Sequence, residues 1–147
     1  MLFRFEASIF LGKPIASVGQ FKEAAEQLLA LGPKAVLIKG GHLEGEPKEL
    51  VDYLIWHDRK DDVPVIFHKE FKHPRIPTSN THGTGCSLSS AIATYLADQH
   101  DLSHSVAKAI SFVSAAIEAG QRLDIGKGPG PLWHMHDFYP TRLPEEQ

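Results

Sequence analysis

The sequence lacks the features that mark secreted, membrane-spanning and polyanion-binding proteins. Its single cysteine, Cys86, excludes any disulfide within the chain, which is typical of a reducing compartment. Its longest apolar runs, such as 35–38, are far too short to span a bilayer, and residues 1–10 do not have the layout of a signal peptide. The net charge of -3 has both signs interspersed, which disfavours nucleic acid and anionic membranes as partners. We therefore expect a cytoplasmic protein.

What the chain does have is the size and composition of one ordinary globular domain. It contains 147 residues, of which 42% are hydrophobic and 22% are charged. A domain of this length removes roughly two-thirds of its unfolded surface from water, which leaves no chain for a separate second core. We predict a single domain over residues 1–147.

Hydrophobic spacing predicts a helix followed by a strand in the first third of the chain. Apolar residues recur at helical spacing over residues 19–31, and the Gly32-Pro33 pair ends the pattern. The unbroken apolar run 35–38 is typical of a strand that is buried on both faces of a parallel sheet. Together these segments form a helix-to-strand unit.

The middle of the chain favours a β-hairpin. The β-rich runs 51–56 and 63–67 are separated by polar residues, which indicates an antiparallel pair, and a helix over 49–57 is the competing interpretation. After two prolines, a polar loop that contains glycine covers residues 78–85. Loops of this kind often carry function.

Two helices are predicted after this loop. Two apolar stripes recur at helical spacing between Cys86 and residue 117. Asp101 or Ser103 is expected to cap the second helix, because a short oxygen-bearing side chain can accept the free amides of a helix start. The glycine- and proline-rich segment 126–147 is expected to follow an irregular path over the surface.

Two pairs of histidines have spacings that occur in metal sites. His100 and His104 lie four residues apart on a predicted helix, and His134 and His136 are separated by one residue. Neither pair has a cysteine or carboxylate partner at ligand spacing, and matches of this size are common by accident. We interpret these histidines as surface residues.

The loop residues 81–86 have the composition of an anion site. Gly83 and Gly85 flank Thr84 directly before a predicted helix, so the backbone can turn tightly and its amides can point inward. The free amides and the partial positive charge of the helix start act at the same place. For an isolated Gly-x-Gly, a flexible turn before a helix is the simpler interpretation. The loop is neither a dinucleotide fingerprint, because Leu88 stands in place of the third glycine, nor a Walker A loop, which needs Gly-Lys-Ser/Thr.

Cys86 falls in the first turn of the predicted helix. There the helix dipole and the free amides favour the thiolate form, so Cys86 could act as a base. The alternative is that Cys86 is a small buried apolar residue, as lone cysteines most often are.

Three segments carry a resemblance to a known family. The run Thr81-His82-Gly83-Thr84-Gly85-Cys86 and the Ser/Ala-rich helix after it resemble the signature of the hydroxymethylpyrimidine and phosphomethylpyrimidine kinases of thiamin biosynthesis, in the ribokinase-like superfamily. The run Lys39-Gly40-Gly41-His42 resembles a strand end of that family, and Glu6-Ala7 resembles part of its Asn-x-x-Glu-Ala segment. The resemblance extends from Glu6 to about Leu132 and covers only the later, carboxy-terminal half of a typical member.

The resemblance implies a fold and a set of roles for the loop. The fold would be α/β and ribokinase-like, the carboxy-terminal part of a doubly wound, mainly parallel sheet with flanking helices. Gly83, Thr84 and Gly85 would form the anion hole for the transferred phosphate. Cys86 would accept the proton of the substrate hydroxyl.

The resemblance also implies ATP and Mg²⁺ as cofactors. Lys39 would bind a nucleotide phosphate, although a lysine at a strand end is, taken alone, more often a solvated charge. Glu6 would help to hold the magnesium ion. The family's asparagine falls at Phe3, whose side chain has no oxygen to offer to a metal-bound water.

The implied activity is ATP-dependent phosphorylation of hydroxymethylpyrimidine and its phosphate. Two alternatives remain open, a truncated non-catalytic module for nucleotide binding or assembly, and a kinase of the pyridoxal type. Because half of a doubly wound sheet leaves a bare strand edge and an uncovered apolar face, we expect a homo-oligomer or a complementing amino-terminal chain.

Overall fold

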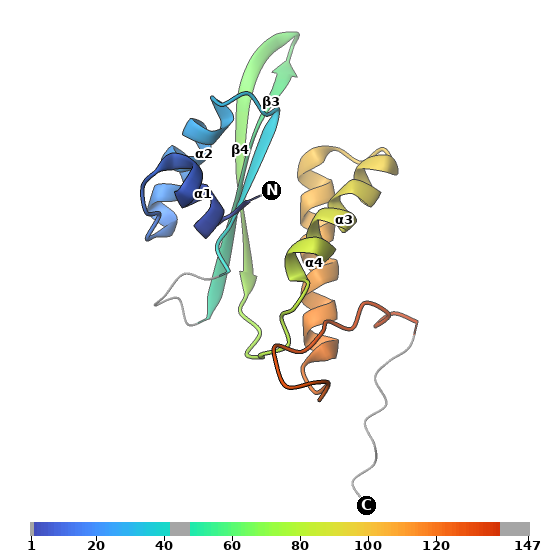
Figure 1. Ribbon diagram of the computed structural model, residues 1–147. Coiled ribbons are helices and arrows are strands. Elements are labelled where there is room, and N and C mark those ends of the chain that lie inside the picture. Colours follow the sequence, from blue (N-terminus) through green and yellow to red (C-terminus); the bar gives the residue numbers. More distant parts are fainter. Residues whose placement is uncertain (1, 42–47, 139–147) are drawn as a thin grey trace, which may run out of the picture. The chain divides into compact units, whose positions relative to one another are not determined.

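The structure, a computed structural model, describes residues 2–41 and 48–138 of the chain (Figure 1). It divides into two compact units, Met1–Arg75 and Ile76–Gln147. The single domain expected over residues 1–147 stays a prediction, and each unit is described by itself. None of the helices in the described ranges is long and apolar enough to cross a membrane.

The first unit is built on a sheet of four strands in the order β1-β2-β3-β4. The strands are β1 (Leu2–Phe3), β2 (Ala35–Lys39), β3 (Glu49–Lys60) and β4 (Val63–Pro74). β2 matches the strand predicted from its apolar run. The predicted hairpin is also confirmed, and β3 and β4 are both longer than the predicted runs 51–56 and 63–67. The alternative helix over 49–57 is wrong.

The sheet corrects one part of the expected fold class. β1 pairs with β2 in parallel, but β2 with β3 and β3 with β4 are antiparallel, so the described sheet is not mainly parallel. The connections explain the difference. Asp61 and Asp62 both have positive φ, 50° and 63°, and form a tight turn that can join only antiparallel neighbours. The β1-to-β2 connection, by contrast, contains the helices that a parallel crossover needs.

Two helices lie on one face of this sheet (Figure 1). They are α1 (Arg4–Leu11) and α2 (Phe21–Leu29), and the 3₁₀ turn η1 (Val18–Gln20) leads into α2. The predicted helix over 19–31 is therefore confirmed, with its first turn in the 3₁₀ form. The core between helices and sheet is apolar and is made of Ala7, Ile15, Phe21, Ala24, Ala25, Leu28, Leu29, Val36, Ile38, Tyr53 and Ile55.

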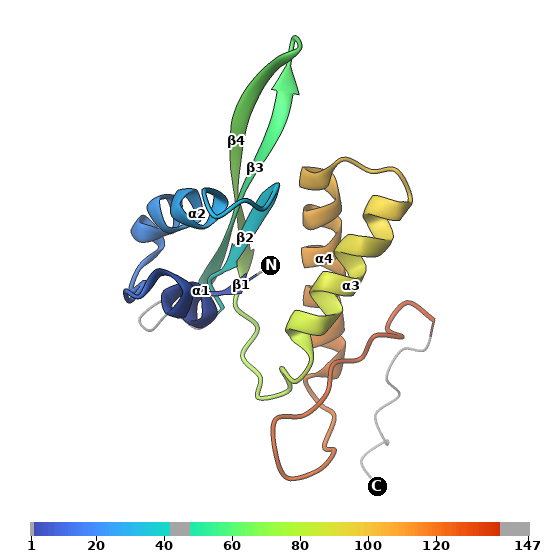
Figure 2. The same ribbon diagram turned by 45° about the horizontal axis from the view of Figure 1, so that its top comes forward.

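The second unit is a pair of helices with irregular segments at both ends. Figure 2 shows α3 (Thr84–Ala97) and α4 (Leu102–Gly120) side by side. Both helices were predicted, and α3 begins two residues before Cys86 because the loop itself supplies the first turn. The Asp101 side chain accepts the His104 amide at 2.9 Å, which makes Asp101 rather than Ser103 the cap of α4. Residues 126–138 follow an irregular path, as expected.

Candidate functional site

The glycine loop ends in the first turn of α3. Gly83 is the N-terminal cap, with φ +88°, a left-handed conformation that glycine adopts without strain. Gly83 has no side chain to satisfy the helix start, and the amides of Gly85 and Cys86 lie in the first turn, where a helix provides no carbonyl partner. Such amides, together with the helix dipole, are features that favour an anion.

A buried asparagine holds this loop in place. Asn80 is 6% exposed, and its Nδ2 donates to the carbonyl oxygens of Gly120 and Leu123, each at 2.8 Å. The His82 amide donates to the Gly130 carbonyl at 3.1 Å, and Gly130 packs so closely on Asn80 that a Cβ there would collide with the amide. The loop is therefore tied to the end of α4 and to the segment that follows it. Sequence analysis missed Asn80, because its partners lie 40 and 43 residues further on.

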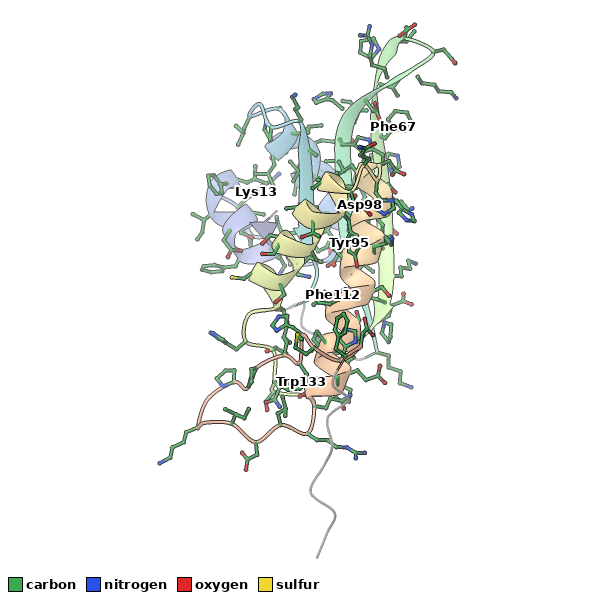
Figure 3. All side chains as sticks on the ribbon, turned by 90° about the vertical axis from the view of Figure 1, so that its right-hand side faces the viewer. Lys13, Phe67, Tyr95, Asp98, Phe112 and Trp133 are labelled. Carbon is green, nitrogen blue, oxygen red and sulfur yellow. The ribbon has the colours of Figure 1, made fainter. Side chains whose placement is uncertain are left out.

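Cys86 opens onto a groove in the second unit. The Cys86 side chain is exposed, which argues against the alternative of a buried apolar cysteine. The groove has a volume of about 400 Å³. Figure 3 shows two of its aromatic side chains, Tyr95 on α3 and Phe112 on α4. The residues that line it are Cys86, Ser87, Ser90, Ala91, Thr94, Tyr95, Phe112 and His134.

A serine and a histidine among the residues that line this groove contact each other. Ser87 Oγ donates to the Gly83 carbonyl at 2.8 Å and lies 2.6 Å from His134 Nε2. Since the hydroxyl proton is used by Gly83, the His134 ring donates to Ser87 in this arrangement. The rings of His134 and His136 also lie 6.4 and 5.4 Å from that of Phe112. These two histidines anchor the irregular segment to the helices.

The other histidine pair is held by local charges. His100 Nε2 lies 3.4 Å from Asp98 Oδ2 and 3.2 Å from Lys108 Nζ, and the His104 ring is 4.9 Å from the His100 ring. An adjacent ammonium group disfavours a bound cation. Within residues 2–41 and 48–138, no group of three or more His, Cys, Asp or Glu side chains is placed to hold a metal ion.

In the first unit, Lys39 ends β2 beside a buried carboxylate. Lys39 Nζ lies 3.5 Å from Asp52 Oδ2, and its side chain is 11% exposed. Asp52 on β3 is 1% exposed, and its Oδ1 accepts the Gly40 amide at 3.0 Å. His73 Nε2 on β4 approaches the same Oδ2 to 3.4 Å. Lys39 is therefore a paired residue in the structure, and the interpretation of a solvated charge is wrong.

The charges around Asp52 set its ionisation. Burial raises the pKa of Asp52, but the neighbouring His73 ring, the Lys39 ammonium and the Gly40 amide together lower the pKa below its ordinary value. Asp52 is therefore ionised at neutral pH. Sequence analysis missed it, although a single carboxylate inside the otherwise apolar run 51–56 was a visible signal.

Glu6 lies in the first turn of α1 and is exposed to solvent. Lys39 and Glu6 belong to the first unit, and the loop from Gly83 to Cys86 belongs to the second. The structure brings the loop residues together with one another, and it brings Lys39 together with Asp52. The roles that the resemblance implies for these residues stay predictions.

Known proteins similar to this chain agree on one family. A family model described as phosphomethylpyrimidine kinase matches residues 4–133. A hydroxymethylpyrimidine/phosphomethylpyrimidine kinase of Rhizobium meliloti is 39% identical over 135 residues, which are 91% of this chain and 47% of that protein. A thiamine biosynthesis bifunctional protein, ThiED, of Geobacter sulfurreducens is 42% identical over 88% of this chain and 24% of its own length.

A solved structure shows the same fold. An ADP complex of Bacillus subtilis pyridoxal kinase superimposes with a TM-score of 0.74 and is 30% identical, over 90% of this chain and 48% of that one. The ribokinase-like α/β fold predicted from the sequence is thereby confirmed. The chain spans about half the length, or less, of the curated relatives it matches.

Proposed function

This chain belongs to the phosphomethylpyrimidine kinase family, and we propose that it acts as the nucleotide-side half of an ATP-dependent kinase of thiamin biosynthesis. The proposed reaction is the phosphorylation of hydroxymethylpyrimidine and of its phosphate. The observation that carries the proposal is the start of α3, where Gly83 turns the backbone and the Gly85 and Cys86 amides have no carbonyl partner within the helix. A transferred phosphoryl group would meet these amides and the helix dipole together.

Cys86 is the proposed base of the reaction. Its thiolate takes the proton of the substrate hydroxyl, the hydroxyl oxygen bonds to the γ-phosphorus of ATP, and the bond from that phosphorus to the bridging oxygen breaks to release ADP. The charge that develops on the transferred group is neutralised by the anion hole of Gly83, Thr84 and Gly85. Exposure of Cys86 on a groove supports this role, because the thiolate must reach a bound substrate.

Lys39 and Glu6 are the proposed partners of the nucleotide. Lys39 would bind a phosphate with its ammonium group. The Glu6 carboxylate is exposed and offers oxygen, the ligand that Mg²⁺ prefers, and this ion is commonly held by one or two carboxylates together with substrate phosphates. Glu6 therefore fits a metal that arrives with the nucleotide, and the bound ion would neutralise phosphate charge.

Two other functions rest on specific observations. Similarity to a pyridoxal kinase favours phosphorylation of a pyridoxal-type substrate as the second candidate function. The same loop could bind the phosphate that is transferred to the hydroxyl group of either substrate. Phe3, which stands where the family's asparagine would fall and has no oxygen to offer to a metal-bound water, favours a non-catalytic module for nucleotide binding or assembly as the third. The measurement of product described below separates the two substrates, and binding without product from either is the result expected for the third candidate and for a kinase half that lacks its partner.

The proposed assembly contains a second chain and lies in the cytoplasm. Phe5, Ile9 and Phe10 on α1 are 70%, 64% and 66% exposed, an unusual amount of bare apolar surface for one short helix. A homo-oligomer or a complementing amino-terminal chain would cover these side chains. We propose that residues 1–147 contribute one truncated ribokinase-like domain to it.

Calorimetric titration with a non-hydrolysable ATP analogue and Mg²⁺, followed by an assay of product from ATP and hydroxymethylpyrimidine, tests the proposal. Binding together with phosphorylated pyrimidine is the expected result for a self-sufficient kinase. Binding without product would point to a missing amino-terminal partner, and product only from pyridoxal would favour the second candidate. Absence of nucleotide binding would refute the proposal.

Cys86→Ala tests the proposed base. Loss of a general base lowers kcat by about 10²- to 10⁴-fold, while nucleotide affinity should persist because the backbone amides remain. Ser90→Ala is the matched control, since Ser90 also lines the groove on α3 but has no proposed chemical role. Unchanged turnover in Cys86→Ala would remove Cys86 from the mechanism.

A further inference from the structure

A buried carboxylate lies between a lysine and a histidine side chain near the end of β2. Asp52 is 1% exposed and uses its two oxygens differently. Oδ1 accepts the Gly40 amide at 3.0 Å. Oδ2 has no hydrogen-bond partner among the described residues, and Lys39 Nζ and His73 Nε2 approach it only to 3.5 and 3.4 Å.

Stability of the fold is a poor explanation for this arrangement. Removing a carboxylate and an ammonium group from water is costly, and well-packed apolar residues in place of a buried ion pair are often equally or more stable. The neighbours of Asp52 on β3, Val51 and Tyr53 to Ile55, are all buried, so an apolar residue would suit this strand. The contacts of the carboxylate are instead with the residues at the end of β2 and with His73.

One side chain fixes Lys39 at two points. Asp52 Oδ1 holds the backbone directly after Lys39, and Oδ2 faces the Lys39 ammonium. The separation of 3.5 Å between Lys39 Nζ and Asp52 Oδ2 is longer than the roughly 2.7–2.9 Å of a charge-assisted hydrogen bond. The carboxylate therefore attracts the ammonium group without forming such a bond to it. Arg75 Nη2 also donates to the Gly41 carbonyl at 3.3 Å, which braces the same turn.

We propose that Asp52 is a positioning residue, which orients the Lys39 ammonium toward a phosphate of the bound nucleotide. This inference rests on the proposed function, because it takes Lys39 as the phosphate ligand. A lysine that is already held loses less side-chain freedom when the phosphate binds. Lys39 remains 11% exposed, so an incoming phosphate can reach it.

The inference predicts a coupling between Asp52 and Lys39 in nucleotide affinity. Immobilising one long side chain on binding costs the equivalent of about a three- to tenfold change in affinity. Asp52→Asn keeps an acceptor for Gly40 and removes the charge that faces Lys39, so it should weaken binding by about that factor. In a Lys39→Met background, Asp52→Asn should have no further effect.

The experiment is a double-mutant cycle on the full chain, measured by calorimetric titration with the non-hydrolysable ATP analogue and Mg²⁺. The four proteins are the wild type, Asp52→Asn, Lys39→Met and the double variant. Equal weakening by Asp52→Asn with and without Lys39 would show a merely structural role and overturn the inference. Unchanged or tighter binding by Asp52→Asn would also overturn it, since the carboxylate would then only repel the phosphate.

Two further variants keep the test decisive. His73→Gln retains Asp52 and removes the imidazole ring beside Oδ2, and its affinity for the nucleotide analogue should stay within about twofold of the wild type. Asp52→Glu retains the buried charge but moves it by one methylene, and it replaces Asp52→Asn in the cycle if that variant does not fold. Asp52→Glu should likewise weaken nucleotide binding only when Lys39 is present. No binding by the wild type would refute the proposed function itself, whereas binding that is insensitive to Asp52 would refute this inference alone.

Discussion

Gly40 is the position where a single methyl group should damage the sheet most clearly. A Cβ at Gly40 would lie well under 3.0 Å from the Val51 carbonyl oxygen and 3.2 Å from its carbon, so β2 and β3 would have to separate. Such overpacking costs about 1–3 kcal/mol. The shift would also stretch the 3.0 Å hydrogen bond from the Gly40 amide to Asp52, and a bond to a charged group contributes about 1.5–3 kcal/mol. Gly40→Ala should therefore lower the free energy of unfolding by about 3–5 kcal/mol.

Gly41→Ala provides the control in the adjacent residue. A Cβ at Gly41 meets nothing within 4 Å, so this variant should stay within about 0.5 kcal/mol of the wild type. Urea titration followed by circular dichroism measures both variants, and for a chain of this size Gly40→Ala should also lower Tm by about 10 °C. If Gly40→Ala proved as stable as Gly41→Ala, the close approach of Gly40 to β3 would be refuted.

Two further predictions concern the buried polar side chains. The pKa of Asp52 is lowered in the folded protein, so its charge stabilises the fold above the ordinary value of 3.8, and this contribution is lost as the pH falls through the folded pKa. Urea titrations between about pH 7 and pH 2 should show the stability difference between wild type and Asp52→Asn shrinking below about pH 4, and a difference independent of pH would contradict the charged state. Asn80→Ala removes two hydrogen bonds of 2.8 Å, and although the Gly120 carbonyl keeps the Leu123 amide as a donor, this loss should cost about 1–3 kcal/mol in thermal unfolding. The exposed neighbour Ser79→Ala should change little, and equal losses from both variants would show that Asn80 does not hold the loop.

Local patterns were enough to predict most of the elements and part of the site. Helical spacing in α2, α3 and α4 and the apolar run of β2 depend on neighbours only a few residues away, so the sequence displays them directly. The glycine loop is a local signal as well, because Gly83 needs its left-handed conformation where the helix begins. The sequence also narrowed the cap of α4 to two candidates, Asp101 and Ser103, because a capping side chain lies next to the helix start that it caps.

The direction of the strands was not a local property. An unbroken apolar run such as 35–38 is equally suitable between parallel or antiparallel neighbours, so burial alone could not fix the pairing of β2. The structure shows that β2 pairs antiparallel with β3, and the short turn at Asp61 and Asp62 makes β3 and β4 antiparallel. The sheet is accordingly more antiparallel than the resemblance implied.

The sequence by itself determined most of the elements, though not β1 and α1, and it determined the loop from Gly83 to Cys86 and the lysine at the end of β2. Only the tertiary structure decided what supports them. Asp52 contacts Gly40 across 12 residues of chain, and Asn80 reaches Gly120 across 40. A polar side chain becomes necessary at such a place only when folding has buried it beside a distant partner, and no pattern of neighbouring residues encodes that meeting.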